Sequence, residues 1–158
     1  MSARLWLTAA ALATTLARTA VAQPKESAPP PPPSVSCEFL EISATSAKDA
    51  AIDPELEKLR KKFKKPPFSS WNSFKLLMKT TQQLTQRKTE TIQLKQGKAT
   101  ATLHGIVNTS NVRLAISLED DKGKNIVNTT ATFAGGDYLV YGHSLPDNAG
   151  HMLALTCK

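Results

Sequence analysis

The sequence has few of the features that mark common active sites. None of its serines lies in a Gly-x-Ser-x-Gly turn, so no hydrolase nucleophile of that type is indicated. The three histidines match no known metal-binding spacing. Gly135-Gly136 has the spacing of a hairpin and lacks the following helix that a phosphate-binding loop requires. From motifs alone we therefore predict no cofactor, no metal site and no catalytic residues.

Long apolar runs are also scarce, and the one at the start of the chain is short. Arg4 precedes an uncharged stretch rich in Ala and Leu from Leu5 to Leu16, and Ala20-Val21-Ala22 offers small residues for cleavage. This pattern predicts a secretory signal peptide over residues 1–22. A membrane anchor needs about 20 continuous apolar residues, and Arg18 interrupts the run too early. We expect an exported protein, periplasmic or extracellular, with no later membrane span.

Proline is concentrated in one segment that follows this leader. Pro29 to Pro33 fix successive φ angles and remove backbone donors, which favours polyproline II geometry. Residues 23–36 are therefore predicted to form a tether, which serves either as a stiff spacer or as a ligand for an aromatic groove.

Cysteine is limited to Cys37 and Cys157, which bracket almost all of the remaining chain. In an oxidising compartment an even pair favours a disulfide, and the alternative is two buried free thiols. If the bond forms, the first and last strands of the domain must be neighbours.

After Phe68 the hydrophobic pattern alternates with a period of two between turn residues. Over residues 112–118, for example, Val, Leu and Ile at even positions alternate with Arg, Ala and Ser, as in a strand with one buried face. Seven or eight short strands at such spacing, with no helices between them, indicate an antiparallel β-sandwich or barrel. The prediction is a mainly β fold that forms a single domain over residues 37–158.

One amphipathic helix is predicted near the start of this domain, over residues 54–65. Asp53 is a good N-cap and Pro54 suits the first helical position. The apolar face consists of Leu56, Leu59 and Phe63. Pro66-Pro67 ends the helix.

The residues from Pro66 to Phe74 read Pro-Pro-Phe-Ser-Ser-Trp-Asn-Ser-Phe. Together with the preceding helix they resemble a group of small exported bacterial proteins with no assigned activity. The resemblance covers residues 53 to 80 and implies no chemistry, cofactor or site residue.

Positive charge is concentrated between Lys58 and Lys98, where twelve Lys or Arg residues accompany one acid, Glu90. A concentrated basic surface attracts anions. The residues predicted to bind an anion are Lys58, Arg60, Lys61, Lys62, Lys64 and Lys65. The alternative is that they form only the solvated face of an amphipathic helix.

Aromatic residues are interleaved with these lysines. Phe68 and Trp71 are predicted to form an aromatic surface that contacts an anionic membrane or a polyanionic glycan. The alternative is that these aromatics form the core that docks the helix onto the sheet. Because export is expected, no nucleic-acid partner is predicted.

Three functional hypotheses follow. The first is a non-catalytic exported binding or assembly module that contacts an anionic envelope component or another envelope protein through the basic surface of residues 58–98, including peripheral membrane contact. The second is a small hydrolase or metalloenzyme that uses His143, His151 and Asp147, provided that the last two strands pair. The third is an inhibitor or structural subunit that adds a partner strand at an exposed sheet edge.

Overall fold

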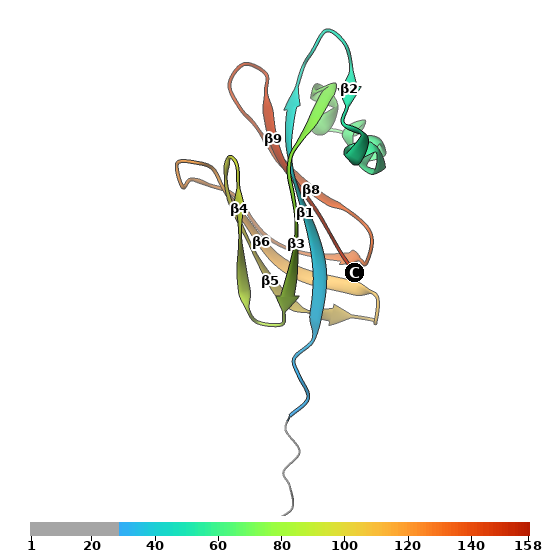
Figure 1. Ribbon diagram of the computed structural model, residues 1–158, viewed down its shortest axis with the longest axis vertical. Helices are drawn as coiled ribbons and strands as arrows, with labels where there is room; N and C mark the ends of the chain where they lie inside the picture. Colours follow the sequence, from blue (N-terminus) through green and yellow to red (C-terminus); the bar gives the residue numbers. More distant parts are fainter. Residues whose placement is uncertain (1–28) are drawn as a thin grey trace, which may run out of the picture. The chain divides into compact units, whose positions relative to one another are not determined.

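A computed structural model describes residues 29–158, so the predicted signal peptide 1–22 and residues 23–28 of the predicted tether lie outside the described residues. Within this range nine strands form two sheets, with the orders β2-β3-β1-β9-β8 and β4-β5-β6-β7 (Figure 1). The strands are β1 Ser34–Thr45, β2 Ala51–Ile52, β3 Ser73–Thr85, β4 Thr89–Leu94, β5 Gly97–Val107, β6 Asn111–Glu119, β7 Asn125–Ala134, β8 Leu139–Ser144 and β9 Gly150–Cys157. The strand pairs are antiparallel except for the short contact between β2 and β3. The predicted mainly β, antiparallel sandwich is confirmed, with nine strands in place of seven or eight.

The predicted tether ends earlier than expected. Residues 29–33 are exposed and have no regular secondary structure, but β1 begins at Ser34. Val35 is buried in the core, and Ser36 exchanges two backbone hydrogen bonds with Lys158, at 3.0 and 2.8 Å. Burial and pairing of residues 34–36 therefore make them part of the sheet, and the predicted boundary at residue 36 is wrong.

β1 lies at the centre of its sheet and is buried on both faces. One face packs against the second sheet in a core that we call the inter-sheet core. The other face packs beneath the helical residues in a core that we call the helix-side core. The residues of β1 in the inter-sheet core are Val35, Cys37 and Phe39, and those in the helix-side core are Leu40, Ile42 and Ala44. This strand therefore joins the two cores.

The predicted helix over residues 54–65 is present as a shorter, mixed segment, drawn in green beside β2 in Figure 1. It consists of the 3-10 helix η1 Pro54–Leu59 and the α-helix α1 Arg60–Phe63, and a second 3-10 turn, η2 Phe68–Ser70, follows. The predicted helix over 54–65 is therefore a 3-10 helix over its first six residues, and it ends at Phe63, two residues earlier than predicted.

The spacing of the apolar residues explains this mixture. Asp53 caps the segment as predicted, because its Oδ1 accepts a hydrogen bond from the backbone N–H of Glu55 at 3.2 Å. Leu56 and Leu59 are three residues apart, a separation that a 3-10 turn aligns on one side. Leu59 and Phe63 are four residues apart, which an α-helical turn aligns. All three are buried in the helix-side core.

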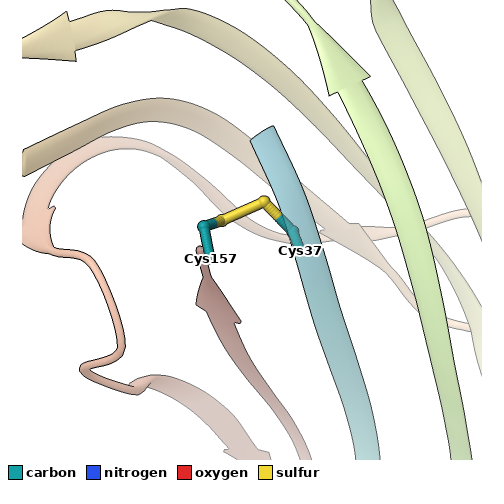
Figure 2. The surroundings of a disulfide bond; sticks show 2 residues. All are labelled: Cys37 and Cys157. Carbon is teal, nitrogen blue, oxygen red and sulfur yellow. A yellow bond between two sulfur atoms is a disulfide. The ribbon is translucent and has the colours of Figure 1, made fainter. Parts of the chain in front are cut away.

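The predicted disulfide is confirmed. Cys37 of β1 and Cys157 of β9 face each other in register, and their sulfur atoms are 2.04 Å apart (Figure 2). The first and last long strands are therefore neighbours, as predicted. A stable disulfide is typical of proteins in an oxidising compartment. Among residues 29–158, none of the helices has the length and apolar character needed to cross a membrane.

Candidate functional site

The cations of the helical segment differ in whether a carboxylate already holds them. Lys58 Nζ lies 2.7 Å from Glu38 Oε1 and 4.7 Å from the centre of the Tyr138 ring. Arg60 Nη2 lies 2.7 Å from Glu57 Oε2, one turn earlier in the segment. These two predicted anion-binding residues are therefore partly neutralised within the protein.

Glu38 is the centre of the ion-pair network that engages Lys58. It also accepts a hydrogen bond from the Tyr138 hydroxyl at 2.6 Å and lies 3.5 Å from Lys79 Nζ. Burial alone raises the pKa of the Glu38 carboxyl, but hydrogen bonds from Lys58 and Tyr138 and the charge of Lys79 hold this pKa at about 2, below the ordinary value of 4.5. Glu38 is thus ionised at neutral pH and neutralises part of the basic surface.

The other four predicted anion-binding residues keep their charge free. All are exposed, and among residues 29–158 none forms an ion pair with a carboxylate. They are Lys61, Lys62, Lys64 and Lys65, and we call them the lysine cluster. The cluster presents four positive charges within five consecutive residues, none of them in an ion pair with the described part of the chain.

The aromatic residues that follow are less exposed than predicted. Trp71 is only 9% exposed, and its Nε1–H donates a hydrogen bond to the Asn148 carbonyl at 2.9 Å. Its ring lies so close to Gly150 that a Cβ on that residue would be 2.5 Å away. Phe68 is half-buried, with its ring near Gly142. The predicted aromatic surface is therefore wrong for Trp71, and these aromatics dock the segment onto the sheet.

A cavity of about 380 Å³ lies between the helical segment and the neighbouring ends of β2 and β3. Its apolar walls are Ile52, Phe63, Trp71 and Phe74. Arg60 of α1 and Lys64, the residue that follows α1, also line it, so the cavity is adjacent to the lysine cluster. It combines an aromatic wall with positive charge.

The two C-terminal histidines are brought together as the second hypothesis required, but Asp147 does not join them. His143 and His151 face each other in register on β8 and β9, with ring centroids 5.4 Å apart. Asp147 lies in the connecting loop, with a φ of 61°. Over residues 29–158 there is no group of three or more His, Cys, Asp and Glu side chains arranged to hold a metal ion. The predicted trio is therefore not assembled.

A buried acid that the sequence analysis missed lies beside His151. Glu41 is 0% exposed, and its Oε1 is 2.9 Å from His151 Nε2. Its carboxylate also accepts the backbone N–H groups of Lys95 at 2.7 Å and Gln96 at 2.8 Å. The available signal was an acid within the apolar stretch from Phe39 to Ala44.

The pKa values of Glu41 and of His143, which faces His151, are both lowered. Burial raises the pKa of Glu41, but hydrogen bonds from His151 and from the two backbone N–H groups bring it below its ordinary value of 4.5. Burial, followed by the charge of His151, lowers the pKa of His143 below its ordinary value of 6.5. Because Glu41 already accepts three hydrogen bonds, it serves as a structural tie and is poorly suited to act as a free base.

No family model, curated protein or solved structure matches this chain. The function is therefore argued from the geometry of its own residues.

The outer strands of the two sheets bear on the third hypothesis. These are β2 and β8 in the first sheet and β4 and β7 in the second. Because β2 pairs only with Ser73 and Phe74, the rest of β3 has no outer neighbour among the strands of residues 29–158. This edge carries exposed Lys75 and Lys79, and lysines on an edge disfavour the addition of another strand. The edge is therefore a weaker candidate surface than the lysine cluster.

Proposed function

We propose that this protein is an exported, non-catalytic binding module that attaches to an anionic component of the cell envelope, in the periplasm or outside the cell. The observation that carries the proposal is the lysine cluster, whose four exposed side chains have no carboxylate partner within residues 29–158. The disulfide and the predicted signal peptide over residues 1–22 support export.

The helical segment presents the cluster on a fixed support. Leu56, Leu59 and Phe63 are 0 to 2% exposed, so the turn that carries the lysines is held against the sheet. Each Lys near an anionic membrane surface contributes about 1 kcal/mol of attraction. At physiological salt this attraction fades over a Debye length of ~8 Å. We expect attachment that is direct, sensitive to salt and dependent on the cluster.

A binding role without catalysis is supported by the state of the buried polar groups. The Glu41 carboxylate accepts three hydrogen bonds from within the protein. The three side chains of the enzyme hypothesis are not gathered into one site. These observations favour the first hypothesis over the second.

Sedimentation with lipid vesicles tests the proposal. Vesicles with and without phosphatidylglycerol are compared over a range of salt concentrations, with the wild-type protein and with a variant in which Lys61, Lys62, Lys64 and Lys65 are changed to Gln. The matched control removes the same charge from four other exposed lysines that form no ion pair among residues 29–158, namely Lys48, Lys95, Lys122 and Lys124.

We expect the wild-type protein to bind only the anionic vesicles and to dissociate as salt is raised. The cluster variant should bind at least about tenfold more weakly, because four contributions of about 1 kcal/mol are lost. The control variant should change binding by less than about threefold, because its lysines lie outside the cluster, on the loop before β2 and on two turns of the second sheet. Equal loss in both variants would show that net charge alone acts, and retention by the cluster variant would refute the proposal.

A further inference from the structure

The cavity beside α1 has the size of a small-molecule site. Its volume of about 380 Å³ is near the lower end of the roughly 300 to 1,000 Å³ typical of ligand pockets, and its lining combines apolar and polar groups. The walls supplied by Ile52, Phe63, Trp71 and Phe74 are apolar, and Ser69 and Asn72 add polar atoms. A space of this size accepts one ring system or one short chain and excludes a two-chain lipid.

The aromatic walls are fixed by contacts within the protein. Phe63 and Phe74 are stacked with ring centroids 4.0 Å apart and planes 5° from parallel. Trp71 is held by its hydrogen bond to Asn148 and by close packing on Gly150. Because these rings are already positioned, a ligand need not order them, and this lowers the entropic cost of binding.

The charge at the cavity selects the kind of ligand. Arg60 and Lys64 are four residues apart, so they lie on the same side of α1, and both line the cavity. No carboxylate among residues 29–158 lines it. Arg60 is paired with Glu57, but this pair is exposed to solvent and can be exchanged for a ligand anion at little cost. An anionic group at this position would therefore be attracted by two cations.

We propose that this cavity binds a small amphiphilic carboxylate, with its ring or chain against Phe63, Trp71 and Phe74 and its acid group at Arg60 and Lys64. The inference deepens the proposed function and rests on it in one respect, because Lys64 belongs to the lysine cluster. It assigns the cavity to a free acid with one ring system or one chain, whereas the cluster as a whole contacts the envelope surface.

Fluorescence of Trp71 tests this assignment directly. The chain contains two tryptophans, so Trp6→Phe leaves Trp71 as the only one, whether or not residues 1–22 are retained. The probes are naphthoate and its uncharged analogue naphthamide, followed by decanoate and decanamide. We expect each acid to change Trp71 emission saturably and to bind at least about tenfold more tightly than its amide, because the amide cannot pair with the two cations.

Two pairs of variants locate the probe. Ser69→Phe and Ala50→Phe each place a ring at the cavity and leave all lysines intact. Each variant should therefore abolish the binding of naphthoate and of decanoate. The temperature of thermal unfolding and the binding to vesicles should stay unchanged. Arg60→Gln combined with Lys64→Gln should remove the preference for the acid over the amide. The same two substitutions should leave weak naphthamide binding in place.

These results separate the cavity from the proposed function. Saturable naphthoate binding that both filling variants abolish supports the cavity site even if vesicle binding fails. Vesicle binding that depends on the lysine cluster, without any saturable response of Trp71 to naphthoate or decanoate, overturns the cavity site alone. Naphthoate binding that survives both Ser69→Phe and Ala50→Phe also overturns it, because the probe then lies elsewhere.

Discussion

At the scale of single residues, the histidine that faces His151 couples folding to pH. His143 lies on β8, and the charged groups that act on it are His151 of β9, Asp120 at the β6–β7 turn and Lys124 of the same turn. Its Nδ1 is buried and has no hydrogen-bond partner in the described part of the chain. Protonation of this ring therefore occurs more readily in the unfolded chain.

The pH dependence of stability follows from this difference. The folded pKa of His143 lies below its ordinary value of 6.5, so the unfolded state binds more protons as pH falls below that value. Its contribution to stability is complete above pH 6.5 and is lost as pH falls toward the folded pKa. We expect the free energy of unfolding in urea to be lower at about pH 5.5 than at about pH 7.5.

His143→Gln should reduce this difference, because the substituted side chain does not titrate. His104→Gln is the matched control, since His104 is exposed on β5. A wild-type protein that is equally stable at both pH values would contradict the prediction.

Glu38 affects stability in a separate, more acidic pH range. Because its folded pKa is about 2, its contribution to the free energy of unfolding is present above pH 4.5 and is lost as pH falls toward 2.

The residue types at the basic surface were predictable, but their pairing was not. Clustering of lysines over residues 58–65 is visible in the sequence. Engagement of Lys58 by Glu38 and Tyr138 joins residues 20 and 80 positions away in the chain, so no local pattern reports it. Burial of Trp71 likewise depends on Asn148 and Gly150 from the other end of the domain.

At the scale of elements, Glu41 ties the two sheets together. It belongs to β1 of the first sheet, and it accepts the backbone N–H groups of the turn between β4 and β5 in the second sheet. His151 of β9 holds the same carboxylate from within the first sheet. One side chain therefore satisfies two backbone donors of this turn.

Substitution of this acid tests the tie. In Glu41→Gln the amide nitrogen must face one of the N–H donors of Lys95 or Gln96, so one hydrogen bond is replaced by two opposed donors. We expect the free energy of unfolding to fall by about 3 kcal/mol, because a backbone N–H loses its hydrogen bond to a buried, charged acceptor. Urea unfolding at neutral pH measures this loss.

Glu57→Gln is the control for this experiment, because Glu57 is exposed and its one ion pair among residues 29–158 is with Arg60. It should change stability by less than about 0.5 kcal/mol. A loss of similar size in both variants would show that the Glu41 carboxylate does not join the sheets.

The elements with a local signal were predictable, and those defined by distant partners were not. Asp53 and Pro54 mark the start of the helical segment in the sequence, and the structure begins it there. Alternation identified β6, whose even-numbered residues from Val112 to Leu118 are buried. β1 reads as only partly buried because Glu38 and Glu41 interrupt its apolar residues, and each acid finds its partners on elements far along the chain.

At the scale of the whole molecule, two cysteines were enough to predict that the first and last long strands are neighbours, but not how the remaining strands are ordered. β1 lies between β9, its disulfide partner, and β3, which follows the helical segment. The pairing of β1 with β3 aligns Cys37 with Gln82, and such long-range register leaves no local pattern in either strand. Backbone hydrogen bonds between Ser36 and Lys158 extend the closure to the residues just outside the two cysteines.

The disulfide closes a segment with a sequence separation of 120, so its loss should act mainly on the unfolded state. The chain-entropy model assigns a loop of this size about 4 to 5 kcal/mol. We expect Cys37→Ala combined with Cys157→Ala to lower the free energy of unfolding by about 3 to 5 kcal/mol, which urea unfolding would measure.

Wild-type protein unfolded with an excess of reductant should match the double variant, because both lack the covalent link. Stability of the double variant within about 1 kcal/mol of wild type would mean that β1 and β9 are held by pairing and core packing alone. Both cysteine residues are 0% exposed and lie in the inter-sheet core. The double variant should therefore still fold at neutral pH and lose mainly its resistance to denaturant.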